Sequence, residues 1–266
     1  MPLSITSTQN PKIKQLLALQ QKSSERRKNG LFVVEGRREL EHCIAAGYEV
    51  ESVFADSPPA LPMREGVVTY AVSRHVYERI AYRGTTEGVV AIVRAKSLSL
   101  EDLTPSLKER GKGGESLFIV LESVEKPGNL GAVLRSADAA GATAVIVCDP
   151  LTDLYNPNLI RASIGACFTV PMVACTSEEC IRFLKENDVQ ILTAQLQDSS
   201  LYYDIDMTRP TAIVMGTEST GLTDLWRQAA DAHIRIPMLG RLDSLNVSVS
   251  AAILLFEAVR QRRIGI

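Results

Sequence analysis

The chain has 266 residues, of which 45% are hydrophobic and 23% charged, so it is long and apolar enough to bury one large core or two modest ones and is not a disordered protein. Its 29 basic and 31 acidic side chains give a formal net charge of −2, which argues against a protein that coats nucleic acid over its whole surface. No apolar run is long enough to span a bilayer and the N-terminal sequence lacks a signal-peptide core, so we expect a cytoplasmic protein with no membrane contact.

Helix and strand patterns alternate over the first hundred residues. A helical stretch follows Pro11, another covers 37–46, and strand patterns occur at 31–35, 51–55, 67–72 and 89–93. The sequence AKSLSLEDLTPSLKERGKGGES then interrupts this pattern with charged, Gly and Ser residues. We therefore predict a first domain at 1–96, a linker at 97–115 and a second domain at 116–266.

Positive charge is concentrated at the beginning of the chain. The first 40 residues carry eight basic and three acidic side chains, a net charge of +5, so the remainder carries −7. A basic end of this kind is typical of a surface that binds a phosphate-rich partner, and a solvated helix face explains it equally well.

The second domain has a more regular pattern of apolar strands separated by helical segments. Strands are predicted at 117–121, 143–147, 190–194, 211–215 and 233–237. This order indicates an α/β fold with a largely parallel sheet. Ligands of such sheets bind at the carboxyl ends of the strands, so the loops that follow the strands are the candidate site.

The five cysteines and three histidines show no metal-ligand spacing. None of the cysteines forms a C-x-x-C pair and the histidines lie in unrelated segments, so we predict no metal site. An odd number of cysteines, mostly in apolar runs, is typical of buried free thiols in a reducing compartment.

The first unusual loop reads ESVEKPGNLGAVLRSADAAGA. Its Pro and Gly residues make a tight turn before a helix, with Asn129 in the turn and Arg135 about one helical turn further on. A Pro-Gly turn with an Asn cap and an exposed Arg is the simpler explanation, and an Arg at this place could instead hold a phosphate with two hydrogen bonds.

The second loop reads GTESTGL and contains Gly216, Glu218 and Gly221. Glycines directly after a buried strand let a ligand approach the backbone, and a nearby carboxylate can hold a ribose hydroxyl or a cation. Taken alone the pattern is also that of an ordinary strand-to-helix turn, in which the Glu favours the helix N-terminus.

The third loop reads IPMLGRLDSLNVSVS and leads into an apolar helical run at 247–259. Ser244, Asn246 and Ser248 alternate there with apolar residues. Capping accounts for one polar residue of this kind, and three are more than a cap requires. A helix start that mixes polar and buried residues is suited to the wall of a small-ligand site.

Together and in this order, the three loops resemble the three motifs of the SpoU (TrmH-like) family of RNA 2'-O-ribose methyltransferases, across roughly 116–263. The N-terminal NPKIKQLLAL, the basic cluster and FVVEGRREL resemble the family's substrate-binding domain. The resemblance implies S-adenosylmethionine as methyl donor, RNA as substrate and a homodimer with active sites at its interface. It further implies a trefoil-knotted SPOUT methyltransferase domain with a parallel sheet and a small N-terminal α/β domain akin to RNA-binding ribosomal proteins.

The resemblance also assigns roles to individual residues. The implied catalytic residues are Asn129, Arg135, Glu218, Ser244 and Asn246. The implied cofactor-binding residues are Leu196, Gly216, Glu218, Gly221, Ile236, Met238 and Leu245. The implied RNA-binding residues are Lys12, Lys14, Arg26, Arg27, Lys28 and Arg37.

The family's motif arginine is often regarded as the group that activates the ribose hydroxyl. A guanidinium is a poor base because it stays protonated, so our hypothesis is that Arg135 fixes the substrate phosphate and stabilises the developing oxyanion. Glu218 as general base is the competing hypothesis.

Three alternatives remain open from the sequence. A dinucleotide-dependent oxidoreductase is disfavoured because the glycines at 111–114 precede the first strand of the second domain instead of following it. A catalytically silent RNA-binding protein is the stronger rival, since a fold does not guarantee activity. Ribosomal RNA is preferred to transfer RNA because a separate N-terminal domain of this kind is found in ribosomal members.

Overall fold

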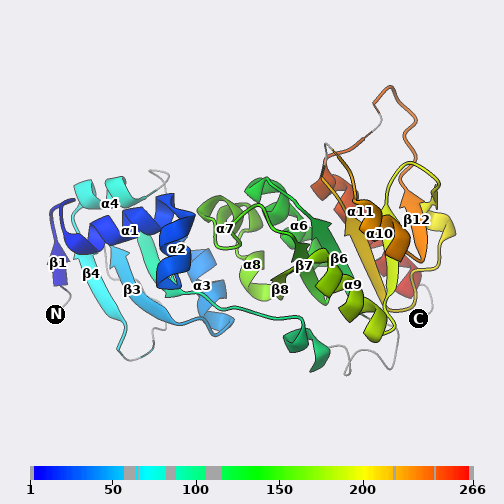
Figure 1. Cartoon of the computed structure of the whole chain (residues 1–266). Helices are drawn as coiled ribbons and strands as arrows, with labels where there is room; N and C mark the ends of the chain where they lie inside the picture. Colours follow the sequence, from blue (N-terminus) through cyan, green and yellow to red (C-terminus); the bar gives the residue numbers. More distant parts are fainter. Residues whose placement is uncertain are drawn as a thin grey trace. The chain divides into compact units, whose positions relative to one another are not determined.

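The computed structural model describes residues 3–56, 64, 66–81, 88–105, 116–217, 220–242 and 244–263 (Figure 1). The chain divides into two compact units. The first unit is Met1–Lys96 together with Asp153–Thr169, and the second is Ser97–Thr152 together with Val170–Ile266. This division differs from the contiguous one predicted from the sequence, because a segment from the middle of the chain packs into the first unit.

The first unit is built on a five-stranded mixed sheet in the order β1-β4-β3-β5-β2. β5 runs antiparallel to β2 and β3, whereas β1, β3 and β4 are parallel. All four predicted strands are present, and β1 is an additional short strand. The strands are β1 Leu3–Ile5, β2 Leu31–Glu35, β3 Val50–Ala55, β4 Val68–Val72 and β5 Val89–Arg94. The helices are α1 Pro11–Gln21, α2 Ser23–Asn29, α3 Arg37–Ala45, α4 Arg74–Ile80, α7 Pro157–Ser163 and α8 Ala166–Thr169.

The local sequence explains why α1 begins where it does. The side chain of Asn10 accepts a hydrogen bond from the backbone N–H of Lys12 at 2.9 Å, and Pro11 occupies the first helical position, where a missing N–H costs nothing. The helix then buries Ile13 and Leu16 in the core of the first unit.

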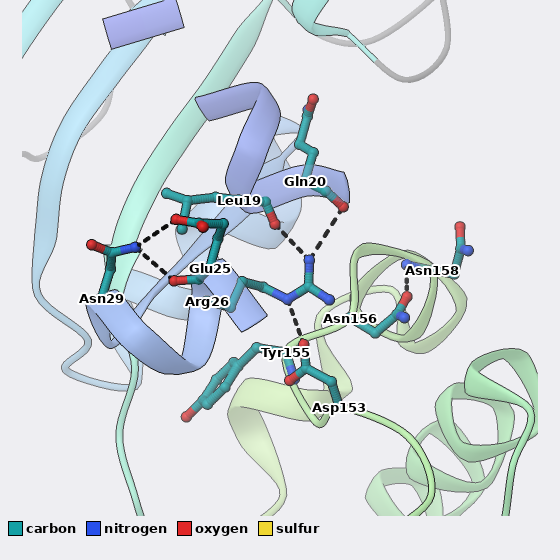
Figure 2. A network of polar contacts seen from close by, with 9 residues as sticks. All are labelled: Leu19, Gln20, Glu25, Arg26, Asn29, Asp153, Tyr155, Asn156 and Asn158. Atoms are coloured by element: carbon teal, nitrogen blue, oxygen red, sulfur yellow. Dashed lines mark hydrogen bonds and ion pairs between the residues drawn. The ribbon is translucent and has the colours of Figure 1, made fainter. Parts of the chain in front are cut away.

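Arg26 of α2 is buried, with 5% of its surface exposed. Figure 2 shows its guanidinium forming an ion pair with Asp153 and donating hydrogen bonds to the carbonyl oxygens of Leu19 and Gln20. The prediction that Arg26 contacts RNA is therefore wrong: its charge is satisfied inside the protein. A buried ion pair is stable only when both charges keep their partners, so this pair fixes the position of Asp153 against α2.

Aromatic stacking holds the same segment in the first unit. The ring of Tyr155 stacks on Phe32 of β2 with centroids 4.3 Å apart, and Phe168 lies 6.0 Å from Phe32 on centroids. The Tyr155 hydroxyl donates a hydrogen bond of 2.6 Å to the carbonyl oxygen of Lys96. Packing of residues 153–169 therefore combines burial of large rings with directional hydrogen bonds.

The second unit contains a seven-stranded sheet in the order β10-β12-β9-β11-β6-β7-β8, and all its strand pairs are parallel. This confirms the predicted α/β fold with a parallel sheet. Strands 190–194 and 211–215 have the predicted bounds, the other three differ at their ends, and β8 and β10 were not predicted. The strands are β6 Leu117–Glu122, β7 Ala144–Cys148, β8 Met172–Cys175, β9 Gln190–Ala194, β10 Ser200–Leu201, β11 Thr211–Met215 and β12 Ala232–Arg235.

Helices cover this sheet and build its core. α11 packs against α6 and against β6 and β11 (Figure 1). Phe118 and Val120 of β6 belong to a core cluster with Leu184 of α9 and Trp226 of α10. The α-helices are α6 Pro127–Ala140, α9 Ser177–Glu186, α10 Asp224–Ala229 and α11 Val247–Arg263, and two 3-10 turns are η1 Glu101–Leu103 and η3 Tyr202–Asp204.

None of the helices in the described part of the chain is long and apolar enough to cross a membrane.

Glu257 on α11 provides a pH-dependent stabilising contact. It is 8% exposed and accepts hydrogen bonds from Arg260 at 2.7 and 2.8 Å and from Gln261 at 2.8 Å. The hydrogen bonds from Arg260 lower the pKa of Glu257 below its ordinary value. A carboxylate with a lowered folded-state pKa stabilises the fold above its unfolded pKa, and this stabilisation is lost as the pH falls through the folded-state pKa.

We therefore expect Glu257→Gln to lower stability by about 1 kcal/mol near neutral pH, or about 2 to 4 °C in Tm, and by clearly less near pH 3. Thermal unfolding of both proteins at the two pH values tests this. An equal Tm difference at both would show that the charge of Glu257 does not contribute.

Candidate active site

A cavity of about 430 Å³ opens at the carboxyl ends of the neighbouring strands β12, β9 and β11. Ser244 of the third loop also lines it. Glu218 lies outside the described residues. The predicted cofactor-binding residues that line this cavity are Leu196, Gly216, Gly221, Ile236, Met238 and Leu245.

The loop after β11 folds back on itself at the mouth of this cavity. The backbone N–H of Gly221 donates to the carbonyl oxygen of Thr217 at 3.1 Å, and the hydroxyl groups of Thr217 and Thr220 are 2.7 Å apart. Gly221 has a φ of +69°, a conformation that suits glycine. A Cβ on Gly216 would lie only 2.2 Å from the carbonyl oxygen of Gly221, so position 216 admits no side chain while the loop keeps this shape.

A buried carboxylate anchors the far end of this loop. Glu122, at the end of β6, is 4% exposed and accepts hydrogen bonds from the backbone N–H of Thr223 at 2.9 Å and from its hydroxyl at 2.7 Å. The indole N–H of Trp226 donates to Ser177 at 2.9 Å, which holds the start of α10. Sequence reasoning missed Glu122 because it looks like the last residue of a strand, and the residue it binds is distant in the sequence.

A second, smaller cavity of about 140 Å³ lies beside the first. Val124 and Asn129, from the first loop and α6, line the small cavity only. Gly216, Thr217 and Val247 line both cavities, so the second loop and the start of α11 form a shared wall.

The first and third loops are joined by a side-chain hydrogen bond. Asn246 donates from Nδ2 to Oδ1 of Asn129 at 3.2 Å. The Oδ1 atom of Asn246 accepts from the backbone N–H of Ser248 at 3.0 Å and from its hydroxyl at 2.6 Å, which caps the start of α11. The structure thus brings together two of the predicted catalytic residues, although they lie far apart in the sequence.

Comparison with known proteins identifies the family. Residues 116–256 match the SpoU rRNA Methylase family, and residues 10–91 match the MRM3-like substrate binding domain. The chain belongs to the SpoU rRNA methylase family. The matched region contains all three loops, so the family predicted from their motifs is confirmed.

Relatives of known structure or curated function cover most of the chain. The 23S rRNA (guanosine-2'-O-)-methyltransferase RlmB of Bordetella pertussis is 40% identical over 185 residues, which are 68% of this chain and 74% of that protein. A crystal structure of an RNA 2'-O ribose methyltransferase is 38% identical with a TM-score of 0.82, covering 98% of this chain and 99% of the other. An AdoMet-bound rRNA methyltransferase from Sinorhizobium meliloti is 29% identical with a TM-score of 0.85, covering 97% of each chain.

The motif arginine of this SpoU methylase is exposed on α6. Arg135 is on the exposed side of α6, lines neither cavity, and has no hydrogen-bond or ion-pair partner among the residues that the structure describes. Its neighbours on the helix, Val133 and Leu134, are fully buried. Packing of these neighbours fixes the helix, so the guanidinium projects into solvent from a rigid element.

Two polar residues that sequence reasoning missed line the larger cavity. Gln195 follows β9 directly, and Arg227 is on α10. Gln195 Oε1 and Arg227 Nε are buried and have no hydrogen-bond partner within the described part of the chain. The loop after β9 could have been singled out by the rule that directed attention to the other three loops, because it too follows a buried parallel strand.

The predicted RNA-binding residues lie on three helices of the first unit. Five of the six are exposed, and Arg26 is the buried exception described above. Arg37 pairs with Glu41 one turn along α3 at 2.9 Å, an exposed ion pair that contributes little to stability. The five exposed residues are Lys12 and Lys14 on α1, Arg27 and Lys28 on α2, and Arg37 on α3.

The hydrogen bond between Asn129 and Asn246 leads to a testable prediction. We expect Asn129→Ala and Asn246→Ala each to lower methyl-transfer kcat about 10-fold to 100-fold, and the double variant to be little worse than either, because each change breaks the same contact. Single-turnover assays of the four proteins measure the coupling, expected at about 1 kcal/mol or more. Pairing Asn129→Ala with the exposed Gln228→Ala should give additive effects, and additivity for both pairs would contradict a shared role.

Proposed function

We propose that this chain transfers the methyl group of S-adenosylmethionine to the 2'-hydroxyl of a ribose in ribosomal RNA. The single observation that carries this is the pair of adjoining cavities at the carboxyl edge of the sheet. The larger is lined by six of the seven residues predicted to bind the cofactor, and Asn129 lines the smaller. Gly216, Thr217 and Val247 line both cavities, so the two reactants would lie against the same three residues.

The larger cavity suits S-adenosylmethionine in size and chemistry. Its volume of about 430 Å³ is within the range of small-molecule sites. Ile236, Met238 and Leu245 offer apolar surface for an adenine ring. Gln195 and Arg227 add two polar side chains to this lining.

The cofactor, when bound, supplies a methyl group activated by a positively charged sulfur. The protein's own residues have two tasks: to orient the ribose and to handle the proton of its 2'-hydroxyl. Asn129 and Asn246, tied together by their hydrogen bond, orient the ribose. Arg135 holds the substrate phosphate and stabilises the negative charge that develops on the oxygen as its proton leaves.

Glu218 is the alternative acceptor for the hydroxyl proton. The two assignments differ in the pH-rate profile. If Glu218 is the base, Glu218→Gln shifts the profile, whereas a flat profile unaffected by this change removes Glu218 from that role.

The active form is proposed to be a homodimer of chains whose second unit carries the family's trefoil knot. Exposed apolar side chains near the site support a dimer contact: Val249 and Phe256 on α11 are 48% and 47% exposed, and Leu245 is 39% exposed. Because Val249 and Phe256 are seven residues apart, they lie on one face of α11. An interface there would cover the loop that lines the cofactor cavity.

The first unit is proposed to bind the RNA. It matches a substrate-binding domain and carries the exposed cations of α1, α2 and α3. The ribosomal substrate is supported by relatives such as the RlmB enzyme, which is a 23S rRNA methyltransferase. We also propose a cytoplasmic location, as expected from the sequence.

The proposal is tested by isothermal titration of the full chain with S-adenosylmethionine, followed by transfer of labelled methyl to purified ribosomal and transfer RNA. We expect one cofactor per chain, loss of binding in a Leu245→Ala, Asn246→Ala double variant, and label in ribosomal RNA. A folded protein that binds RNA but no cofactor would establish the catalytically silent alternative. Label in transfer RNA alone would overturn the ribosomal assignment.

A further inference from the structure

Three cysteines that are separated in the sequence meet at one end of the parallel sheet in the second unit. Cys148 and Cys175 are the last residues of β7 and β8 and are paired in register across these neighbouring strands. Cys180 lies in the first half of α9. The three Sγ atoms all lie within 4.8 Å of one another.

The elements that hold these sulfurs are fixed by backbone hydrogen bonds. β7 and β8 are joined by the sheet ladder, so Cys148 and Cys175 keep their separation. The start of α9 is held by a capping box, in which Thr176 accepts from the backbone N–H of Glu179 at 3.2 Å and Glu179 accepts from that of Thr176 at 2.8 Å. Cys180 donates its backbone N–H to the carbonyl oxygen of Thr176 at 3.1 Å, which ties it to the same cap.

The cluster lies largely inside the protein. Cys148 and Cys180 are fully buried, and Cys175 is half-buried, so an ion would enter from the side of Cys175. Within the described residues, no histidine or carboxylate joins the three sulfurs as a further ligand at the same mutual distance.

We propose that Cys148, Cys175 and Cys180 bind one soft metal ion of the cuprous class through three thiolates. Thiolates select soft metals, and a metal–sulfur distance of about 2.3 Å in a trigonal site places the sulfurs about 4 Å apart, within reach of the observed arrangement. Structural zinc sites take four ligands, and here the side chains supply three. Each thiol releases its proton to solvent as its sulfur binds.

This site is independent of the proposed methyl transfer. None of the three cysteines lines either cavity at the active site. The spacing of the cysteines gave no sign of a metal site because the ligands come from two strands and a helix. The competing explanation is packing alone, since Cys148 and Cys180 belong to the hydrophobic core and cysteine packs as a small apolar side chain.

The test uses the full chain, reduced and kept under inert gas, with Cu(I) supplied from a chelator of known affinity. We expect one Cu(I) retained per chain and, by X-ray absorption, three sulfur neighbours at about 2.3 Å. Cys175→Ala should weaken retention at least tenfold, because it removes one of three ligands at a half-buried position where the fold tolerates the change. The matched control is Cys167→Ala, a buried cysteine of the first unit, which should leave retention unchanged.

Thermal unfolding of the metal-free proteins shows that each variant is folded. Three results would overturn the proposal: no Cu(I) retained by the wild-type chain, equal retention by Cys175→Ala and wild type, or nitrogen or oxygen among the neighbours. A parallel titration with Zn(II) separates the two metals, and tighter binding of zinc with a fourth ligand that is not sulfur would likewise overturn the three-sulfur assignment.

Discussion

Gly216→Ala is expected to weaken S-adenosylmethionine binding about a hundredfold, which is about 2.7 kcal/mol, without unfolding the protein. A Cβ at this position would lie 2.2 Å from the carbonyl oxygen of Gly221, a contact that no real side chain makes. The obstacle is a backbone atom, so the backbone at Gly216 or at Gly221 must shift. Because this loop is part of the wall of the larger cavity, a shift of about 1 Å misplaces the groups that contact the ligand.

Isothermal titration with the cofactor measures this loss, and Gly128→Ala is the matched control. Gly128 lies in the first turn of α6, where an added Cβ meets no atom within 4 Å, so the same change should leave cofactor affinity intact. Thermal unfolding should show both variants folded, since Gly216 lies at the partly exposed end of β11. Unchanged affinity in folded Gly216→Ala would mean that the cofactor does not occupy this cavity.

The sheet of the second unit was predictable because its strands are short apolar runs buried on both faces. All five residues of β7 and of β11 are buried, which a parallel sheet covered by helices requires. β10 was not predicted because it has only two residues. β8 was not predicted because its four residues are not all buried, and Ala174 is exposed. The loops of the candidate site were predictable because ligands of parallel sheets bind at the carboxyl ends of the strands, and these ends lie at one edge of the sheet.

Features that depend on contacts distant in the sequence were not predictable. Arg26 lies in a run of three basic residues, and the sequence does not distinguish it from its neighbours Arg27 and Lys28. It is nevertheless buried, because the fold places Asp153, from the middle of the chain, beside it. Glu122 likewise anchors the loop only because the fold places Thr223, which is distant in the sequence, within hydrogen-bonding distance of it. Periodicity indicates which face of an element is buried, and it does not indicate which distant segment covers that face.

Arg135→Ala is expected to lower kcat for RNA methylation by about 100-fold to 1000-fold while leaving the affinity for S-adenosylmethionine unchanged. The guanidinium is exposed and lines neither cavity, so its removal leaves the cofactor site and the packing of α6 intact. Arg135→Lys should retain part of the activity, because an ammonium group still attracts the phosphate but cannot hold it with two hydrogen bonds. Single-turnover methylation assays with saturating cofactor separate this effect from binding.

The control for Arg135 is Arg182→Ala, an exposed arginine on α9 that should leave kcat unchanged. The comparison of Ala and Lys at position 135 decides between two roles for the arginine. If the guanidinium only holds phosphate and stabilises the oxyanion, a lysine substitutes in part, since it keeps the positive charge. A Lys variant as inactive as the Ala variant, with RNA binding intact, would contradict a role that rests on positive charge alone.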